Sequence, residues 1–111
     1  MICWKSCQAI KAGEGEAVLM DRVRARLILR GSVQGVGYRF YVTKHAQRFE
    51  VTGMVRNLPG SEVEVVAEGE RREVEEFIEK VKEGPPGAYV TEARVFWEPW
   101  TGFYPDFRVE Y

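Results

Sequence analysis

The sequence predicts a two-layer α+β sandwich, in which an antiparallel sheet carries two helices on one face. Three observations lead to this fold class. Several runs have apolar residues at every second position, as half-buried strands do, and two runs have them every three or four positions, as amphipathic helices do. Their order is strand, helix, strand, strand, helix, strand, with a short fifth strand at the end. So few helices pack on a single face of a sheet.

Residues 1–20 of the 111-residue chain show no sustained pattern. Residues 11–16 are polar and glycine-containing, which is typical of a flexible stretch. We expect residues 1–20 to be a flexible extension or the product of a misassigned start codon, and residues 21–111 to form one domain. The two cysteines, Cys3 and Cys7, lie in the extension, and no second pair completes a zinc site, so we expect both to be incidental.

The first expected strand covers residues 22–30, where apolar residues alternate with arginines. A glycine-rich stretch follows at residues 31–39, with the sequence Gly-Ser-Val-Gln-Gly-Val-Gly-Tyr-Arg. The first helix is expected at 38–49. The remaining elements are expected at residues 51–58, 62–68, 71–83 (a helix), 89–98 and 107–111. Glu62, Glu64 and Glu68 alternate with small apolar residues, and we expect them to face solvent.

This element order is the split βαβ arrangement of ferredoxin-like folds. The helical crossover makes the first two strands parallel, and the third strand slots between them. Their carboxyl ends then lie on one edge of the sheet, two strand spacings of about 4.8 Å each apart. The glycine stretch follows the first strand, and Asn57 lies at the end of the second. We therefore expect Arg39 and Asn57 to share a site.

The residue types at this edge suit an activated phosphate. Glycine-loop amides and a helix N-terminus can hold an anion, and Arg39 adds forked donors. A tight connection is the alternative for the loop, and a strand cap is the alternative for Asn57. As a site residue, Asn57 can orient a water but cannot deprotonate it well. His45, the only histidine, is expected to be a surface or packing residue. With no strong base or metal cluster, the substrate needs a good leaving group, as in an acyl phosphate.

Three segments resemble the acylphosphatase family: residues 31–39, residues 53–59 (Gly-Met-Val-Arg-Asn-Leu-Pro) and residues 63–69 (Val-Glu-Val-Val-Ala-Glu-Gly). The resemblance implies a ferredoxin-like hydrolase that cleaves the carboxyl–phosphate bond of acyl phosphates to carboxylate and inorganic phosphate, with no metal or cofactor. It also implies that Asn57 positions the attacking water, whose proton passes to the substrate's own phosphate. The phosphoryl group would be bound by the loop amides and the Arg39 side chain, at Gln34, Gly35, Val36, Gly37, Tyr38 and Arg39.

Two positions depart from the family pattern. Met54 stands where an aromatic residue is common, and Glu50 stands where a glycine often ends the first helix. A left-handed conformation at Glu50 would cost about 1 kcal/mol. Two alternatives stay open: a non-catalytic anion-binding or accessory domain of the same fold, and an RNA-binding module. The third strand disfavours the second alternative, because it has three glutamates and no aromatic residue on which bases could stack.

The composition limits the partners. The net charge of −1 argues against a general nucleic-acid or anionic-membrane binder. No apolar run approaches the roughly 20 residues that span a bilayer. We expect a cytoplasmic enzyme whose partners are a small acyl phosphate as substrate and inorganic phosphate as product or inhibitor.

Overall fold

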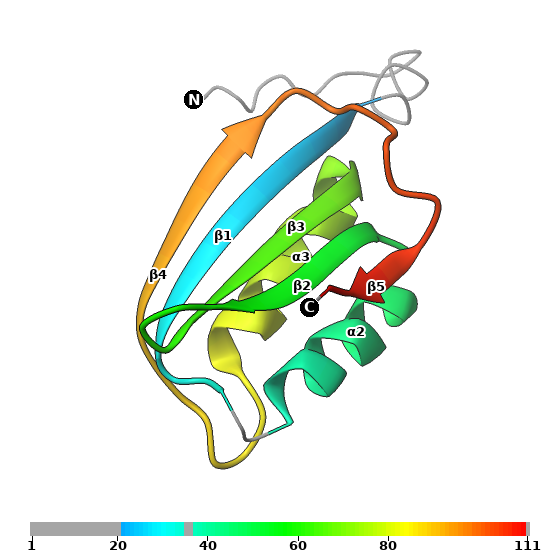
Figure 1. The fold of residues 1–111 in the computed structure, drawn as a ribbon. Helices are drawn as coiled ribbons and strands as arrows, with labels where there is room; N and C mark the ends of the chain where they lie inside the picture. Colours follow the sequence, from blue (N-terminus) through cyan, green and yellow to red (C-terminus); the bar gives the residue numbers. More distant parts are fainter. Residues whose placement is uncertain (1–20, 35–36, 111) are drawn as a thin grey trace.

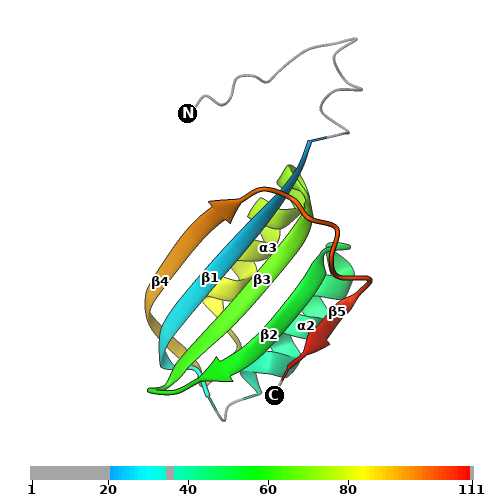
Figure 2. The ribbon, with the colours of Figure 1, turned by 45° about the horizontal axis from the view of Figure 1, so that its top comes forward.

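The computed structural model describes residues 21–34 and 37–110, which form a five-stranded sheet and two helices (Figure 1). The elements are β1 (Arg22–Ser32), α2 (Tyr38–Arg48), β2 (Thr52–Leu58), β3 (Glu62–Glu70), α3 (Arg71–Glu83), β4 (Tyr89–Glu98) and β5 (Phe107–Val109). Both helices cover the same face of the sheet (Figure 2). The prediction for residues 1–20 lies outside the described residues, as do Gly35, Val36 and Tyr111.

The strand order is β4-β1-β3-β2-β5, so β3 lies between the parallel strands β1 and β2 as predicted. The prediction of a wholly antiparallel sheet is wrong at one edge, where β5 pairs with β2 in parallel. The reason is the path of residues 99–106. They leave β4 beside the start of β1, with Glu98 paired to Arg24, and cross to the end of the sheet where β2 begins. Entering there, β5 runs in the same direction as β2 and pairs Phe107 with Gly53.

The core lies between the sheet and the helices. Alternate residues of β1 point to it, and Ala25, Leu27 and Leu29 are fully buried. The helices contribute the residues that the periodicity predicted: Tyr38, Val42 and Ala46 from α2, and Val74, Phe77, Ile78 and Val81 from α3.

The end of α2 explains the unusual residue at position 50. Val51 N–H donates to the Ala46 carbonyl at 3.0 Å, and Glu50 N–H donates to the Gln47 carbonyl at 3.3 Å. These two bonds form a Schellman motif, whose C′ residue must be left-handed. Glu50, which stands where the family often has glycine, has φ 59° and so adopts this left-handed conformation. A side chain in this conformation costs roughly 1 kcal/mol relative to glycine.

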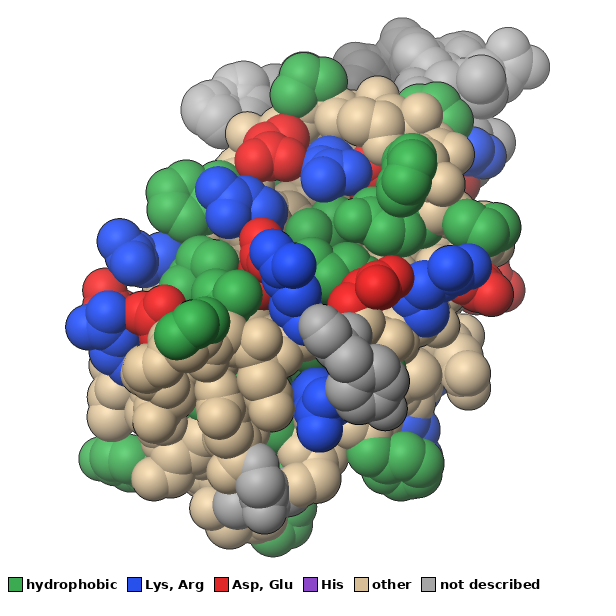
Figure 3. Space-filling view, viewed as in Figure 1, with side chains coloured by type: hydrophobic (Ala, Val, Ile, Leu, Met, Phe, Trp, Pro, Cys, Tyr) green, Lys and Arg blue, Asp and Glu red, His purple; other side chains and the backbone are tan. Residues whose placement is uncertain are grey.

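The other face of the sheet carries acidic and basic side chains with hydrophobic ones between them (Figure 3). The prediction that the β3 glutamates face solvent is wrong for Glu64 and Glu68, which are 6% and 1% exposed. Glu64 bonds Arg26 at 3.2 Å and Arg56 at 2.7 Å on the two neighbouring strands. Glu68 pairs with Arg24 at 3.0 Å. Both buried carboxylates are thus paired with arginine, as buried charges require.

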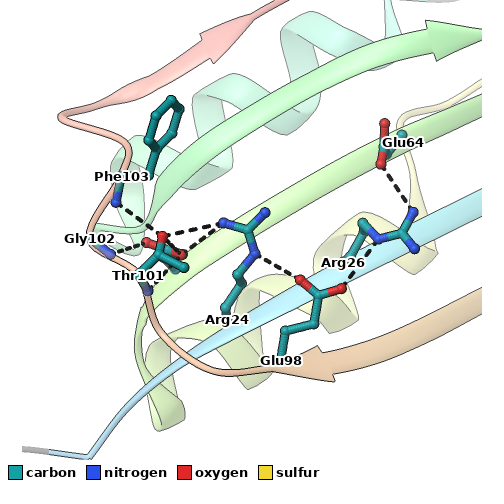
Figure 4. A network of polar contacts seen from close by, with 8 residues as sticks. Arg24, Arg26, Glu64, Glu98, Thr101, Gly102 and Phe103 are labelled. Atoms are coloured by element: carbon teal, nitrogen blue, oxygen red, sulfur yellow. Dashed lines mark hydrogen bonds and ion pairs between the residues drawn. The ribbon is translucent and has the colours of Figure 1, made fainter.

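Glu68 is hydrogen-bonded to the segment 99–106, which we call the crossing strap. Figure 4 shows Thr101, Gly102 and Phe103 of this segment close to Arg24. The Glu68 carboxylate accepts from Arg24 Nη1 at 3.0 Å, Thr101 N at 3.1 Å, Thr101 Oγ1 at 2.6 Å and Gly102 N at 3.0 Å. Burial opposes ionisation of Glu68, but the hydrogen bonds from Thr101, Arg24 and Gly102 outweigh it and lower the pKa of this carboxyl. The alternation of β3 correctly placed Glu68 on the face of the sheet opposite the core. It could not predict that the crossing strap contacts this residue there.

Candidate active site

A pocket of about 330 Å³ lies at the edge of the sheet where β1 and β2 end, against the first turn of α2. Its polar lining comes from Gly37, Arg39, Thr43 and Asn57, and its apolar lining from Val33, Tyr38, Phe40 and Val109. The pocket therefore brings together the two residues that strand topology had placed at this edge, Arg39 and Asn57.

Asn57 reaches the pocket because of its place in β2. Alternate residues of a strand point to the same face. Asn57 therefore shares the helix-covered face with Val55, which is fully buried two residues earlier. Near the end of the strand the helix cover stops, and Asn57 is exposed while still lining the pocket. Its amide offers one acceptor and two donor hydrogens to a bound molecule.

The glycines of the loop have different uses. Gly31 belongs to β1, where a Cβ atom would lie 2.1 Å from the Tyr89 carbonyl oxygen, so this glycine serves the close approach of β4. Gly37 is the N-cap of α2 with φ 74° and ψ 19°, and a Cβ there would meet nothing within 4 Å. Gly37 is thus required for its left-handed backbone. Gly35 and Val36, both predicted to bind phosphate, lie outside the described residues.

The start of α2 has the electrostatics of an anion site. No side chain caps it, and its first turn contains no acidic residue. The first amides of a helix lack intrahelical acceptors and carry the positive end of the helix dipole. Arg39 stands in this first turn, half-buried, and adds a permanent charge at the pocket wall. The start of α2 and the charge of Arg39 therefore both favour an anion in the pocket.

Gln34 is not among the pocket-lining residues. Its side-chain Nε2 donates to the Leu58 carbonyl at 2.9 Å and to the Glu62 carbonyl at 2.8 Å. Its predicted phosphate contact would therefore be made by its backbone, because its side-chain donors bind the β2–β3 hairpin.

Comparison with known proteins decides the family, because the family model described as Acylphosphatase matches residues 25–109. The chain belongs to the acylphosphatase family. An acylphosphatase of Pyrobaculum islandicum is 47% identical over 91 residues, which cover 81% of this chain and 96% of that protein. The crystal structure of acylphosphatase from Bacillus subtilis matches with a TM-score of 0.77 and 34% identity, over 80% of this chain and 99% of that one.

An acylphosphatase structure from Coxiella burnetii also matches, with a TM-score of 0.77 and 36% identity, over 82% of this chain and 95% of that one. The predicted family, α+β fold and activity are confirmed. The protein is an acylphosphatase-type enzyme, which hydrolyses acyl phosphates.

Two further residues near the acylphosphatase pocket have structural roles. The Tyr38 side chain is buried, its hydroxyl donates to the Val81 carbonyl of α3, and burial raises its pKa. His45 lies on α2 away from the pocket lining and packs between Tyr41, at 4.4 Å between ring centroids, and Phe49, at 6.4 Å. Burial and the charges of Lys80 and Arg48 lower the His45 pKa. The expectation of a packing histidine is consistent with these contacts.

The sequence reasoning missed the apolar lining of the acylphosphatase pocket apart from Tyr38, which it predicted as a phosphate-binding residue. One signal was present for Phe40, which falls outside the apolar stripe of α2 and is 75% exposed. An aromatic residue beside a predicted anion site, with no place in the core, is a candidate ligand contact. Val109 gave no such signal, because it reaches the pocket only through the parallel pairing of β5 with β2.

Within residues 21–34 and 37–110, no group of three or more His, Cys, Asp or Glu residues is arranged to hold a metal ion. Neither of the two helices in the described part of the chain has the length and apolar character to cross a bilayer.

Proposed function

We propose that Arg39 and the amides at the start of α2 bind the phosphoryl group of the acyl phosphate, and that Asn57 orients the attacking water. The observation that supports this assignment is the shared pocket, which is lined by Gly37, Arg39 and Asn57. Gly37 and Arg39 lie at the start of α2, whereas Asn57 comes from β2, 18 residues later in the chain. The groups proposed for phosphoryl binding and the group proposed for water orientation therefore line the same pocket.

In this proposal the phosphoryl group binds at the end of the pocket formed by Arg39 and the start of α2. Its equatorial oxygens accept hydrogen bonds from the guanidinium of Arg39 and from backbone N–H groups at Gly37 and Tyr38, with the predicted amides of Gln34, Gly35 and Val36 completing the set. Phosphoryl transfer spreads charge over these oxygens, so positioned donors stabilise the transition state more than the ground state.

Water attacks phosphorus on the side opposite the leaving carboxylate. The Asn57 carbonyl accepts a hydrogen bond from this water, and its NH₂ group donates to a phosphoryl oxygen. As the new P–O bond forms, the bond between phosphorus and the acyl oxygen breaks, and its electron pair leaves with the carboxylate. The water proton passes to a phosphate oxygen. A carboxylate leaves at neutral pH without protonation, so the pocket needs no general acid.

The acyl group has an apolar contact available on the same pocket. Phe40 and Val109 line it together with Val33. We propose that the acyl chain lies against Phe40, which has no core role. Inorganic phosphate, as a product with the same phosphoryl group, should compete for the Arg39 end. The cytoplasmic location, the absence of nucleic-acid partners, and the assignment of residues 1–20 as a flexible extension or the product of a misassigned start codon stay predictions.

The test compares benzoyl phosphate with p-nitrophenyl phosphate, both with EDTA present. We expect the wild type to hydrolyse the acyl phosphate and to leave the ester essentially intact. Arg39→Ala should lower kcat/KM for benzoyl phosphate by roughly 1,000-fold or more and weaken inhibition by phosphate. Arg48→Ala, at the exposed far end of the same helix, is the matched control and should keep wild-type activity. Wild-type turnover by Arg39→Ala would refute the assignment.

A further inference from the structure

We infer that Gln34 is a positioning residue, whose side chain sets the separation between the phosphoryl-binding loop and Asn57. This inference rests on the proposed roles of Arg39 and Asn57. It concerns the side chain of Gln34, whereas the phosphate contact predicted for this residue belongs to its backbone.

The geometry starts from the two carbonyls that Gln34 binds. Leu58 and Glu62 face each other as the last pair of the β2–β3 ladder, and residues 59–61 turn the chain between them. Nε2 of Gln34 donates to both carbonyls, at 2.9 and 2.8 Å. A primary amide nitrogen has two hydrogens, so this contact uses its full donor capacity. The Gln34 side chain thus connects the loop by hydrogen bonds to both strands, β2 and β3, at the turn that joins them.

The contact between Gln34 and the hairpin carbonyls lies between the two halves of the proposed site. Leu58 directly follows Asn57 in the chain, and Gln34 precedes Gly37 and Arg39 in the loop between β1 and α2. Strands β1 and β2 are not neighbours, because β3 lies between them. The backbone ladder therefore gives the loop no direct pairing with β2. The Gln34 amide makes that connection across the end of β3.

The reaction should be sensitive to this connection. Attack in line with the leaving carboxylate requires the water held by Asn57 to lie on the axis through the phosphorus held by the loop. A misplacement of about 1 Å can reduce a rate by about 100-fold. Phosphate binding should be less sensitive, because most of the donors proposed for the phosphate, namely Arg39 and the helix amides, do not depend on the position of Asn57. The positioning role therefore predicts a loss in kcat that exceeds the loss in phosphate affinity.

The experiment uses Gln34→Met, which keeps the length of the side chain and removes both donors, and Gln34→Asn, which keeps the amide but is one methylene too short to reach. Gln47→Met is the control, because Gln47 is exposed on α2 and outside the pocket lining. Activity is measured well below the melting temperature of each variant. We expect kcat for benzoyl phosphate to fall by about 10- to 100-fold in both Gln34 variants. The inhibition constant for phosphate should change less than about threefold, and the control should match wild type.

A double-mutant cycle separates positioning from simple stabilisation. If Gln34 acts by placing Asn57 against the loop, Gln34→Met should lower kcat only slightly further in an Asn57→Ala background. The same fold loss in both backgrounds, or full kcat in Gln34→Met and Gln34→Asn, would overturn the inference while leaving the proposed function intact. A wild type that fails to hydrolyse benzoyl phosphate would overturn the proposed roles of Arg39 and Asn57, and the positioning role with them.

Discussion

Replacing Glu68 by Gln should destabilise the fold strongly at neutral pH. The carboxylate is 1% exposed and accepts from Arg24, from the backbone and hydroxyl of Thr101, and from Gly102. Glutamine keeps the shape but removes the charge and turns one acceptor into a donor that faces other donors. Removing one partner of a buried ion pair costs about 3 to 5 kcal/mol.

The lower end of that range applies here, because Arg24 keeps a second bond, from Nε to Glu98 at 2.8 Å, and its side chain is 19% exposed. We therefore expect a loss of about 3 kcal/mol in the free energy of unfolding. For a domain of this size, that corresponds to a fall in Tm of about 12 to 20 °C.

The stability difference between wild type and Glu68→Gln should depend on pH in a defined direction. The folded-state pKa of Glu68 lies below its ordinary value of 4.5. Its stabilising contribution is therefore present above that ordinary value and is lost as the pH falls through the lowered folded-state pKa. Urea unfolding at a series of pH values should show the gap between wild type and Glu68→Gln shrinking below about pH 4.5.

The control for this series is Glu92→Gln, which alters an exposed carboxylate that lies 3.9 Å from Arg30 and 3.6 Å from Arg94. It should change stability by less than about 1 kcal/mol. A loss below about 1 kcal/mol for Glu68→Gln at pH 7, or a loss that does not vary between pH 7 and pH 2, would show that the buried network does not stabilise the crossing strap as described.

Three further substitutions, with Phe103→Ala as a control, test the pocket and the helix end. Asn57→Ala should lower kcat for benzoyl phosphate by about 100-fold with little change in the phosphate inhibition constant, because the role proposed for this residue is to orient the attacking water; equal losses in both would remove that role. Phe40→Ala should raise KM for benzoyl phosphate about fivefold and leave KM for acetyl phosphate nearly unchanged, since the lost ring contact is worth about 1 kcal/mol. Phe103→Ala removes an equally exposed ring outside the pocket lining and should change neither KM value. Glu50→Gly should raise the free energy of unfolding by up to about 1 kcal/mol without altering kcat, because glycine adopts the left-handed conformation without strain; a less stable variant in thermal melts would contradict the strain at φ 59°.

The sequence allowed the element order and the approximate element bounds to be predicted, because periodicity reports directly on which face of a strand or helix is buried. The meeting of Arg39 and Asn57 in one pocket followed from the split βαβ topology, which puts the ends of β1 and β2 at one edge. The sequence raised a left-handed Glu50 only as a condition, because Glu50 stands where the family often has glycine, and the structure shows that conformation.

Contacts between elements that lack any periodic pattern could not be predicted. Glu68 alternates like a solvent-facing residue, but it is buried, and its carboxylate accepts hydrogen bonds from Thr101 and Gly102 of the crossing strap. The Gln34 side chain could as well have pointed toward the anion site, since nothing in the residue type selects the hairpin carbonyls. The contribution of Val109 required knowing that β5 pairs with β2 in parallel.

The short strand β5 makes one wall of the pocket depend on a weakly held part of the molecule. It has three residues, lies at the edge of the sheet, and is joined to β2 through bonds that include Gly53 N–H to the Asp106 carbonyl and Glu110 N–H to the Val55 carbonyl. Short edge elements open more readily than central strands. Amide exchange at Gly53 and Glu110 should therefore be faster than at Leu27 in β1. If so, the side of the pocket where we propose that the acyl group lies can widen, while the side formed by α2, where we propose that the phosphoryl group binds, keeps its shape. One anion site would then accept acyl groups of different size.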